Sequence, residues 1–106
     1  MEDTEETLEL GGNIKLTGFS DLDAANMVVV KKMVGNYARK MSESAKNFES
    51  LSVVLKRVHE TEKSEKYELH AKMMDNGKAV VSEVTDRNLF FALDKAMKNI
   101  LTQIEQ

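Results

Sequence analysis

The segment from Asn88 to Ile104, NLFFALDKAMKNILTQI, carries the longest regular hydrophobic pattern in the chain. Its apolar residues recur at intervals of three and four positions, which is the spacing of one face of an α-helix. They are Leu89, Leu93, Ala96, Met97, Ile100 and Ile104. Asp86 and Asn88 can accept hydrogen bonds from the free amides at the start of this helix. One amphipathic helix cannot bury its apolar face alone, so the preceding residues must supply a surface for it.

A second amphipathic helix and four strand-like segments precede it. Ser20–Asp23 is a typical helix start, and the apolar residues that follow form one stripe: Met27, Val30, Met33, Val34, Tyr37, Met41 and Ala45. Gly35 within this helix marks either a close approach to a neighbouring element or a tolerated imperfection that costs ~1 kcal/mol relative to Ala. The predicted helix covers Ala24–Ser44, and the predicted strands are Asn13–Phe19, Phe48–Glu60, Lys66–Met74 and Lys78–Thr85.

The connections between these segments predict the topology. Asp75-Asn76-Gly77 is a strong hairpin signal, and the last three strands should form an antiparallel meander because their connections are short. The first strand reaches the second through a helix, so these two strands should be parallel. The prediction is an α+β fold in the order β-α-β-β-β-α, a four-stranded mixed sheet with both helices on one face. The other face, bearing Lys56, His70 and Lys72, should be open to solvent.

Charge is unevenly distributed along the chain. Five of the 18 acidic residues lie in the first nine positions, and Lys and Arg are absent there. Residues 1–12 are therefore predicted to be a disordered acidic leader, and residues 13–106 a single domain. From Gly11 onward the chain holds 15 basic and 13 acidic residues, so a folded body can present a basic face.

Composition excludes several kinds of site. The chain has no cysteine, which rules out disulfides, thiolate metal sites and cysteine nucleophiles. No apolar run approaches the ~20 residues of a membrane span. The N-terminus resembles neither a signal nor a transit peptide, so no membrane association and a cytoplasmic location are expected.

Residues for catalysis are not recognisable. The sequence holds no glycine-rich phosphate loop and no Ser-His-Asp grouping, so an enzyme is not predicted. His59 and His70 lie on predicted neighbouring strands, and Glu68 or Glu60 could join them at a metal ion. The alternative is that both histidines are ordinary solvent-facing strand residues. The seven methionines suit core filling better than a cofactor site.

With this order of elements, the chain resembles the ribosome hibernation-promoting factor family, also called ribosome-associated translation inhibitors. The resemblance extends from about Asn13 to Ile104. It is carried by the turn glycine Gly77, the strand LSVVLKR, and the opening of the last helix. In that opening Phe90, Ala92, Leu93 and Asp94 stand at positions that match the family pattern.

The resemblance implies a stress-response protein that binds the small ribosomal subunit, inhibits translation or stabilises idle ribosomes, and needs no cofactor. Such a protein must bring basic side chains to ribosomal RNA phosphates. The candidate nucleic-acid contacts are Lys31, Lys32, Arg39, Lys40, Lys56 and Arg57. For each residue the alternative is an ordinary solvated charge. The acidic leader and the last residues, Thr-Gln-Ile-Glu-Gln, depart from the basic termini of many family members.

A second hypothesis is a small protein-interaction domain of the same fold that does not bind ribosomes. On the last helix, Phe91, Lys95 and Lys98 fall opposite the apolar stripe, so they are the candidate contacts with a protein partner. An apolar patch around Phe91 would favour this hypothesis, and a continuous basic stripe would favour RNA. The oligomeric state is not predicted.

Overall fold

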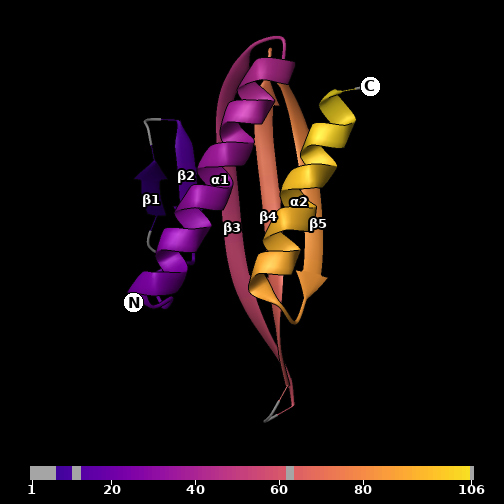
Figure 1. Ribbon diagram of the computed structural model, residues 1–106. Coiled ribbons are helices and arrows are strands. Elements are labelled where there is room, and N and C mark those ends of the chain that lie inside the picture. The colour runs from indigo at the N-terminus through magenta and orange to yellow at the C-terminus, as the bar shows by residue number, and fades with distance from the viewer. Residues whose placement is uncertain (1–6, 11–12, 62–63, 106) are drawn as a thin grey trace.

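The computed structural model describes residues 7–10, 13–61 and 64–105, which form a five-stranded sheet covered on one face by two helices (Figure 1). The elements are β1 (Thr7–Leu10), β2 (Ile14–Thr17), α1 (Ala24–Ser44), β3 (Phe48–Thr61), β4 (Ser64–Asp75), β5 (Lys78–Asp86) and α2 (Leu89–Ile104). From β2 onward, the predicted α+β class and the order β-α-β-β-β-α are confirmed.

The strands lie in the order β1-β2-β3-β4-β5. β2 and β3 are parallel and are connected through α1, whereas β3, β4 and β5 form the expected antiparallel meander. Asn76 and Gly77 connect β4 to β5 with φ angles of 52° and 84°. Two consecutive positive φ angles are typical of the tight hairpin turn that an Asn-Gly pair favours. Figure 1 shows α1 crossing in front of β2 and β3, and α2 lying over β4 and β5.

The N-terminal edge of the sheet differs from the prediction. Thr7–Leu10 fall within the predicted disordered leader, but they form β1 and pair antiparallel with β2. The register aligns Leu8 with Leu16 and Leu10 with Ile14. Because β3 pairs with only one side of β2, the other side offers free backbone amides and carbonyls, and β1 bonds to them. The four predicted strands are thus present and β1 adds a fifth. Residues 1–6 and 11–12 of the predicted leader lie outside the described residues.

The core lies between the helices and one face of the sheet. Each apolar residue of the two predicted helix stripes is buried or packs against the core, and Ala38, Ala92 and Leu101 join them. The helix-facing side of the sheet contributes alternate strand residues: Leu16, Leu51, Val53, Leu55, Leu69, Ala71 and Met73. Because side chains alternate along a strand, the intervening residues form a second face that no helix covers. This uncovered side is called the open face below.

Local interactions determine where the helices begin. The Asp23 carboxylate accepts a hydrogen bond from the Asn26 amide at 2.8 Å, at the start of α1. The Asn88 side chain accepts one from the Phe91 amide at 3.0 Å, at the start of α2. Both caps lie within the predicted start signals.

Two glycines have different roles. Gly18 has a φ of +86°, and a Cβ built there would lie 2.2 Å from the Leu55 carbonyl oxygen. Only glycine fits this close passage between the end of β2 and β3. A Cβ at Gly35 would meet no heavy atom within 4 Å. Of the two explanations for Gly35, the structure therefore supports a tolerated imperfection rather than a close approach.

The β3–β4 hairpin is longer than predicted. The sequence indicates a charged loop over Glu60–Lys66, but β3 continues to Thr61 and β4 begins at Ser64; residues 62–63 lie outside the described residues. In Figure 1 this end of the hairpin extends beyond both helices.

No helix in the described part of the chain is long and apolar enough to cross a membrane.

Candidate functional site

The outer face of α1 carries three of the six predicted nucleic-acid contacts. Lys31, Lys32 and Arg39 are exposed, and Glu43 is the only acidic residue in this helix of 21 residues. Lys32 and Arg39 are seven positions apart, so they project from the same side of the helix, opposite the buried stripe. Lys31 lies at the edge of that side. None of the three forms an ion pair with a residue that the structure describes. We call Lys31, Lys32 and Arg39 the basic face of α1.

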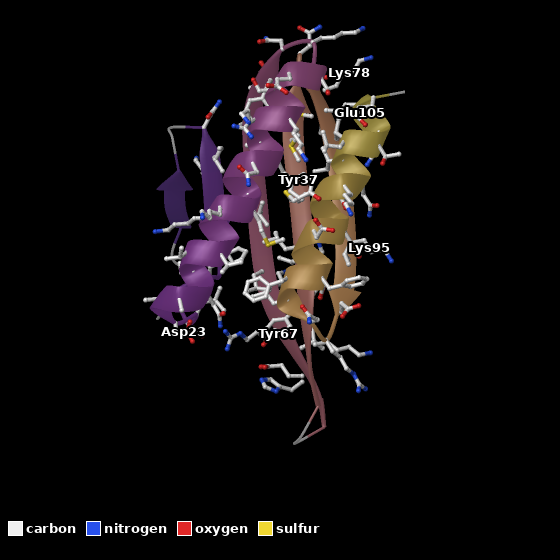
Figure 2. All side chains as sticks on the ribbon, in the orientation of Figure 1. Asp23, Tyr37, Tyr67, Lys78, Lys95 and Glu105 are labelled. Carbon is white, nitrogen blue, oxygen red and sulfur yellow. The ribbon has the colours of Figure 1, made fainter. Side chains whose placement is uncertain are left out.

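Lys40 is exposed but has a different environment. Its Nζ atom lies 5.4 Å from the centroid of the Tyr37 ring, close enough for a cation–π interaction. The Tyr37 hydroxyl donates a hydrogen bond to the Asp94 carboxylate on α2, and Lys98 forms an ion pair with the same carboxylate at 3.1 Å. Figure 2 shows Tyr37 between the two helices. Lys40 and Lys98 belong to competing hypotheses from the sequence. In the structure Lys98 pairs with Asp94, and Lys40 lies close enough for its charge to act on the same carboxylate.

The Tyr37–Asp94 pair alters the acidity of both groups. Burial, followed by the hydrogen bond to the Asp94 carboxylate and its negative charge, raises the pKa of Tyr37 to about 12. The hydrogen bond from Tyr37 is the main cause that lowers the pKa of Asp94. Lys98 and Lys40 lower it further, and burial opposes them. At neutral pH the pair is therefore a neutral phenol bonded to a carboxylate, and it connects α1 to α2.

Lys56 and Arg57 do not form one patch. Neighbouring residues of a strand point to opposite faces, and buried Leu55 defines which side faces the helices. Arg57 therefore lies on the helix side, with its guanidinium carbon 5.9 Å from the centroid of the Tyr67 ring. Lys56 lies on the open face, in register with Glu68. Of this predicted pair, only Lys56 can join a basic surface on the open face.

The open face also holds a basic row that the sequence analysis missed. The strand registers align Lys15 of β2 with Ser52 of β3, and Ser52 with Lys72 of β4. Both lysines are exposed, and they flank a shallow pocket of about 250 Å³ that Asn13, Ser50, Leu51, Ser52 and Met74 also line. Neighbouring strands are ~4.8 Å apart, so the lysine backbones are only two strand spacings apart. Sequence periodicity showed the face of each lysine but not the register that aligns them.

The two histidines are not neighbours. His70 is in register with Val54 on the open face, whereas His59 is in register with Glu65, at the far end of the hairpin. The expectation that the two could lie close is therefore wrong, because the antiparallel register separates them along β3. His59 Nε2 lies 3.5 Å from Glu65 Oε2, and its side chain is 70% exposed.

His70 is instead bracketed by two carboxylates. Its Nε2 atom lies 2.7 Å from Oε2 of Glu68 on the same strand, and its Nδ1 atom lies 3.0 Å from Oε2 of Glu83 on β5. Glu68 is the ligand that the sequence suggested, and Glu83 is one that it missed. Glu83 is exposed and belongs to a different strand, so only the β4–β5 register reveals that it faces His70. Among the described residues, these three form a group that could hold a metal ion.

The predicted protein contacts on α2 are exposed. The Phe91 residue is 57% exposed, and Lys95 projects from the side of α2 that faces away from α1 (Figure 2). Phe91 and Lys95 are four positions apart and therefore lie on the same side of the helix. Lys98 is exposed as well, but its ammonium is paired with Asp94. The candidate partner surface is thus centred on Phe91 and Lys95.

Comparison with models of known protein families and with curated proteins found no match to this chain.

Proposed function

We propose that this protein is a ribosome-associated factor that binds RNA of the small ribosomal subunit through the basic face of α1 and inhibits translation or stabilises idle ribosomes. It acts by binding rather than by catalysis. The observation that carries the proposal is the exposure of Lys31, Lys32 and Arg39 on a helix with one acidic residue, with no ion-pair partner in the described part of the chain. Cations without protein partners are available to bind phosphates.

The geometry of α1 suits contacts with an RNA backbone. Lys32 and Arg39 are separated by two helical turns, or about 10.5 Å along the helix axis. This separation allows the two side chains to reach different phosphates on one side of an RNA surface. Structured RNA hides most base edges, so recognition of this kind depends on shape and phosphates more than on sequence. The fold is also the one that the resemblance to hibernation-promoting factors implies.

Co-sedimentation with purified small ribosomal subunits over a salt series tests this proposal. The parent protein should bind at low salt and lose affinity steeply as salt rises, because each phosphate contact releases counterions. The Lys32→Ala/Arg39→Ala double variant should bind more weakly. A matched control is Lys78→Ala/Arg87→Ala, which removes two exposed charges, one from the first residue of β5 and one from the residue that follows this strand. Absence of binding by the parent at low salt, or equal losses in both double variants, would contradict the proposal.

A protein-interaction domain is the second candidate, and the exposure of Phe91 favours it. Large apolar side chains at the centre of a contact commonly supply much of the binding energy. Under this hypothesis, Phe91→Ala should abolish capture of a protein partner while Lys32→Ala/Arg39→Ala behaves like the parent. A pull-down from cell lysate with separate readouts for RNA and protein distinguishes the two functions.

A further inference from the structure

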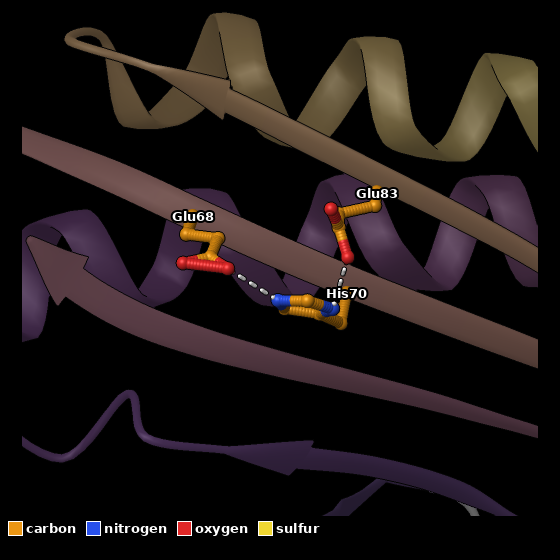
Figure 3. Close-up of side chains that lie close together, drawn as sticks. All are labelled: Glu68, His70 and Glu83. Atoms are coloured by element: carbon orange, nitrogen blue, oxygen red, sulfur yellow. Dashed lines mark hydrogen bonds and ion pairs between the residues drawn. The ribbon is translucent and has the colours of Figure 1, made fainter.

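We propose that Glu68, His70 and Glu83 form a binding site for a divalent transition-metal ion such as Zn²⁺ on the open face of the sheet. The group is independent of the basic face of α1, which lies on the other side of the sheet. Figure 3 shows the imidazole of His70 between the two carboxylates, one from its own strand and one from β5. One ligand atom from each residue lies within 4.8 Å of those of the other two.

The strand geometry brings these groups together without a special loop. Glu68 and His70 are two residues apart on β4, so both point to the open face. Glu83 is in register with His70 on the neighbouring strand, and directly opposed side chains have Cβ atoms ~5 Å apart. Two of the side chains are half-buried, at 35% exposure for His70 and 28% for Glu68. The sheet therefore brings the three side chains together before any ion binds.

The hydrogen bonding of a neutral imidazole leaves one position for a cation. A neutral ring has one N–H group and one nitrogen lone pair. It can therefore donate a hydrogen bond to only one of the two carboxylates that face it, and the other carboxylate faces the lone pair. A cation between that nitrogen and carboxylate would be bound by both.

The existing distances are close to those that such an ion requires. Zn–N and Zn–O bonds of ~2.0–2.2 Å place neighbouring ligand atoms of a tetrahedral site about 3.3 Å apart. The 2.7 Å between His70 Nε2 and Glu68 Oε2 would have to widen by about 0.6 Å to reach that spacing. Glu83 would then accept the Nδ1 hydrogen. This is the arrangement in which a second carboxylate orients a metal-bound histidine.

The surroundings favour an ion that prefers nitrogen ligands. Lys56 is in register with Glu68, and Lys72 lies two residues beyond His70 on the same face. These two positive charges repel a cation that binds mainly through electrostatic attraction. Mg²⁺ and Ca²⁺ also need several oxygen ligands, so both ions should bind poorly. A groove of about 410 Å³ borders His70 and Glu83, with Val54 and Val81 in its wall.

Isothermal titration of the full chain with ZnCl₂ tests the proposal, with MgCl₂ and CaCl₂ as comparison ions. The expected result is saturable binding of one Zn²⁺ per chain. His70→Ala should abolish this binding, and Glu83→Gln should weaken it about 10–100-fold. His59→Ala is the matched control, because His59 is the other histidine and, among the described residues, pairs with Glu65.

The chemical shifts of the imidazole nitrogens, followed by NMR during the same titration, show which ring binds the ion. A selective change at His70 supports the proposal, and far-ultraviolet circular dichroism of each variant shows whether it is folded. If His70→Ala does not fold, Glu68→Gln/Glu83→Gln tests the same site and should lose the selective His70 change. No saturable binding at millimolar Zn²⁺, equal losses in His59→Ala and His70→Ala, or equally tight binding of Mg²⁺ would each overturn the proposal.

Discussion

The two helices lie on the same face of the sheet but differ in how much of their surface they bury. α2 buries seven of its 16 residues. α1 is longer, yet it buries only four of 21. The exposed surface of α1 includes Val28 and Val29 as well as its basic face. A helix that contributes less to the core has more surface available for a partner. We therefore assign stability mainly to α2, and the proposed binding uses the outer surface of α1.

The contact between the helices supports this division. Tyr37 of α1 donates a hydrogen bond to Asp94 of α2. Since α2 is held firmly against the sheet, this bond helps to fix the position and orientation of α1. Substitutions can test the division in order of decreasing effect on stability.

Leu93→Ala should cause the largest loss of stability. Leu93 is fully buried at the centre of the α2 stripe, and truncation would remove apolar contacts and leave a cavity, at a cost of ~2–5 kcal/mol. Chemical denaturation measures the change in the free energy of unfolding. Val28→Ala is a control on α1, where the residue is 59% exposed. Similar losses for the two variants would mean that α2 does not dominate the core.

Tyr37→Phe should cost about 1 kcal/mol at neutral pH, because it removes a hydrogen bond to a carboxylate that remains exposed to some solvent. The pKa of Tyr37 is raised from 10.0 to about 12 in the folded protein. Its protonated form is thus favoured by folding, and its stabilising effect is present below pH 10 and lost as the pH rises toward 12.

At acidic pH, the stabilising effect of Asp94 should show the opposite dependence on pH. The pKa of Asp94 is lowered from 3.8, so its stabilising effect is present above pH 3.8 and lost as the pH falls further. The difference in unfolding free energy between parent and Tyr37→Phe, measured across pH, should therefore shrink at both extremes. A constant difference from pH 3 to pH 12 would contradict the Tyr37–Asp94 interaction.

Gly35→Ala should stabilise the protein by about 0.5–1 kcal/mol, because alanine has a higher helix propensity than glycine. The added methyl group would meet no heavy atom within 4 Å. Thermal unfolding should show a higher Tm. A lower Tm would indicate that the outer surface of α1 is packed against something at this position.

Sequence periodicity was sufficient to predict most of the fold. The buried stripes of both helices follow from their spacing, and the Asn76-Gly77 turn follows from the φ angles that these residues accept. β1 could not be predicted in the same way. Its four residues lie beside an acidic stretch, and the strand is formed by pairing with the free edge of β2.

The candidate sites were less predictable because they depend on register. The pairing of Lys15 with Lys72 across Ser52, and of His70 with Glu83, brings together residues from different strands. Hydrophobic alternation shows the face on which each residue lies, but not its neighbour on the next strand. The basic residues of α1 were predicted correctly as exposed, because they share one helix and its spacing is known.

The salt dependence of small-subunit binding by Lys32→Ala/Arg39→Ala is the most direct test of the proposal that α2 supplies stability and α1 supplies binding. The unfolding free energy of this double variant should lie within roughly 0.5 kcal/mol of the parent. Its binding should be weaker, and its plot of log affinity against log salt should be flatter by about one to two units of slope. Unchanged co-sedimentation and an unchanged slope in a folded double variant would contradict the assignment of binding to α1.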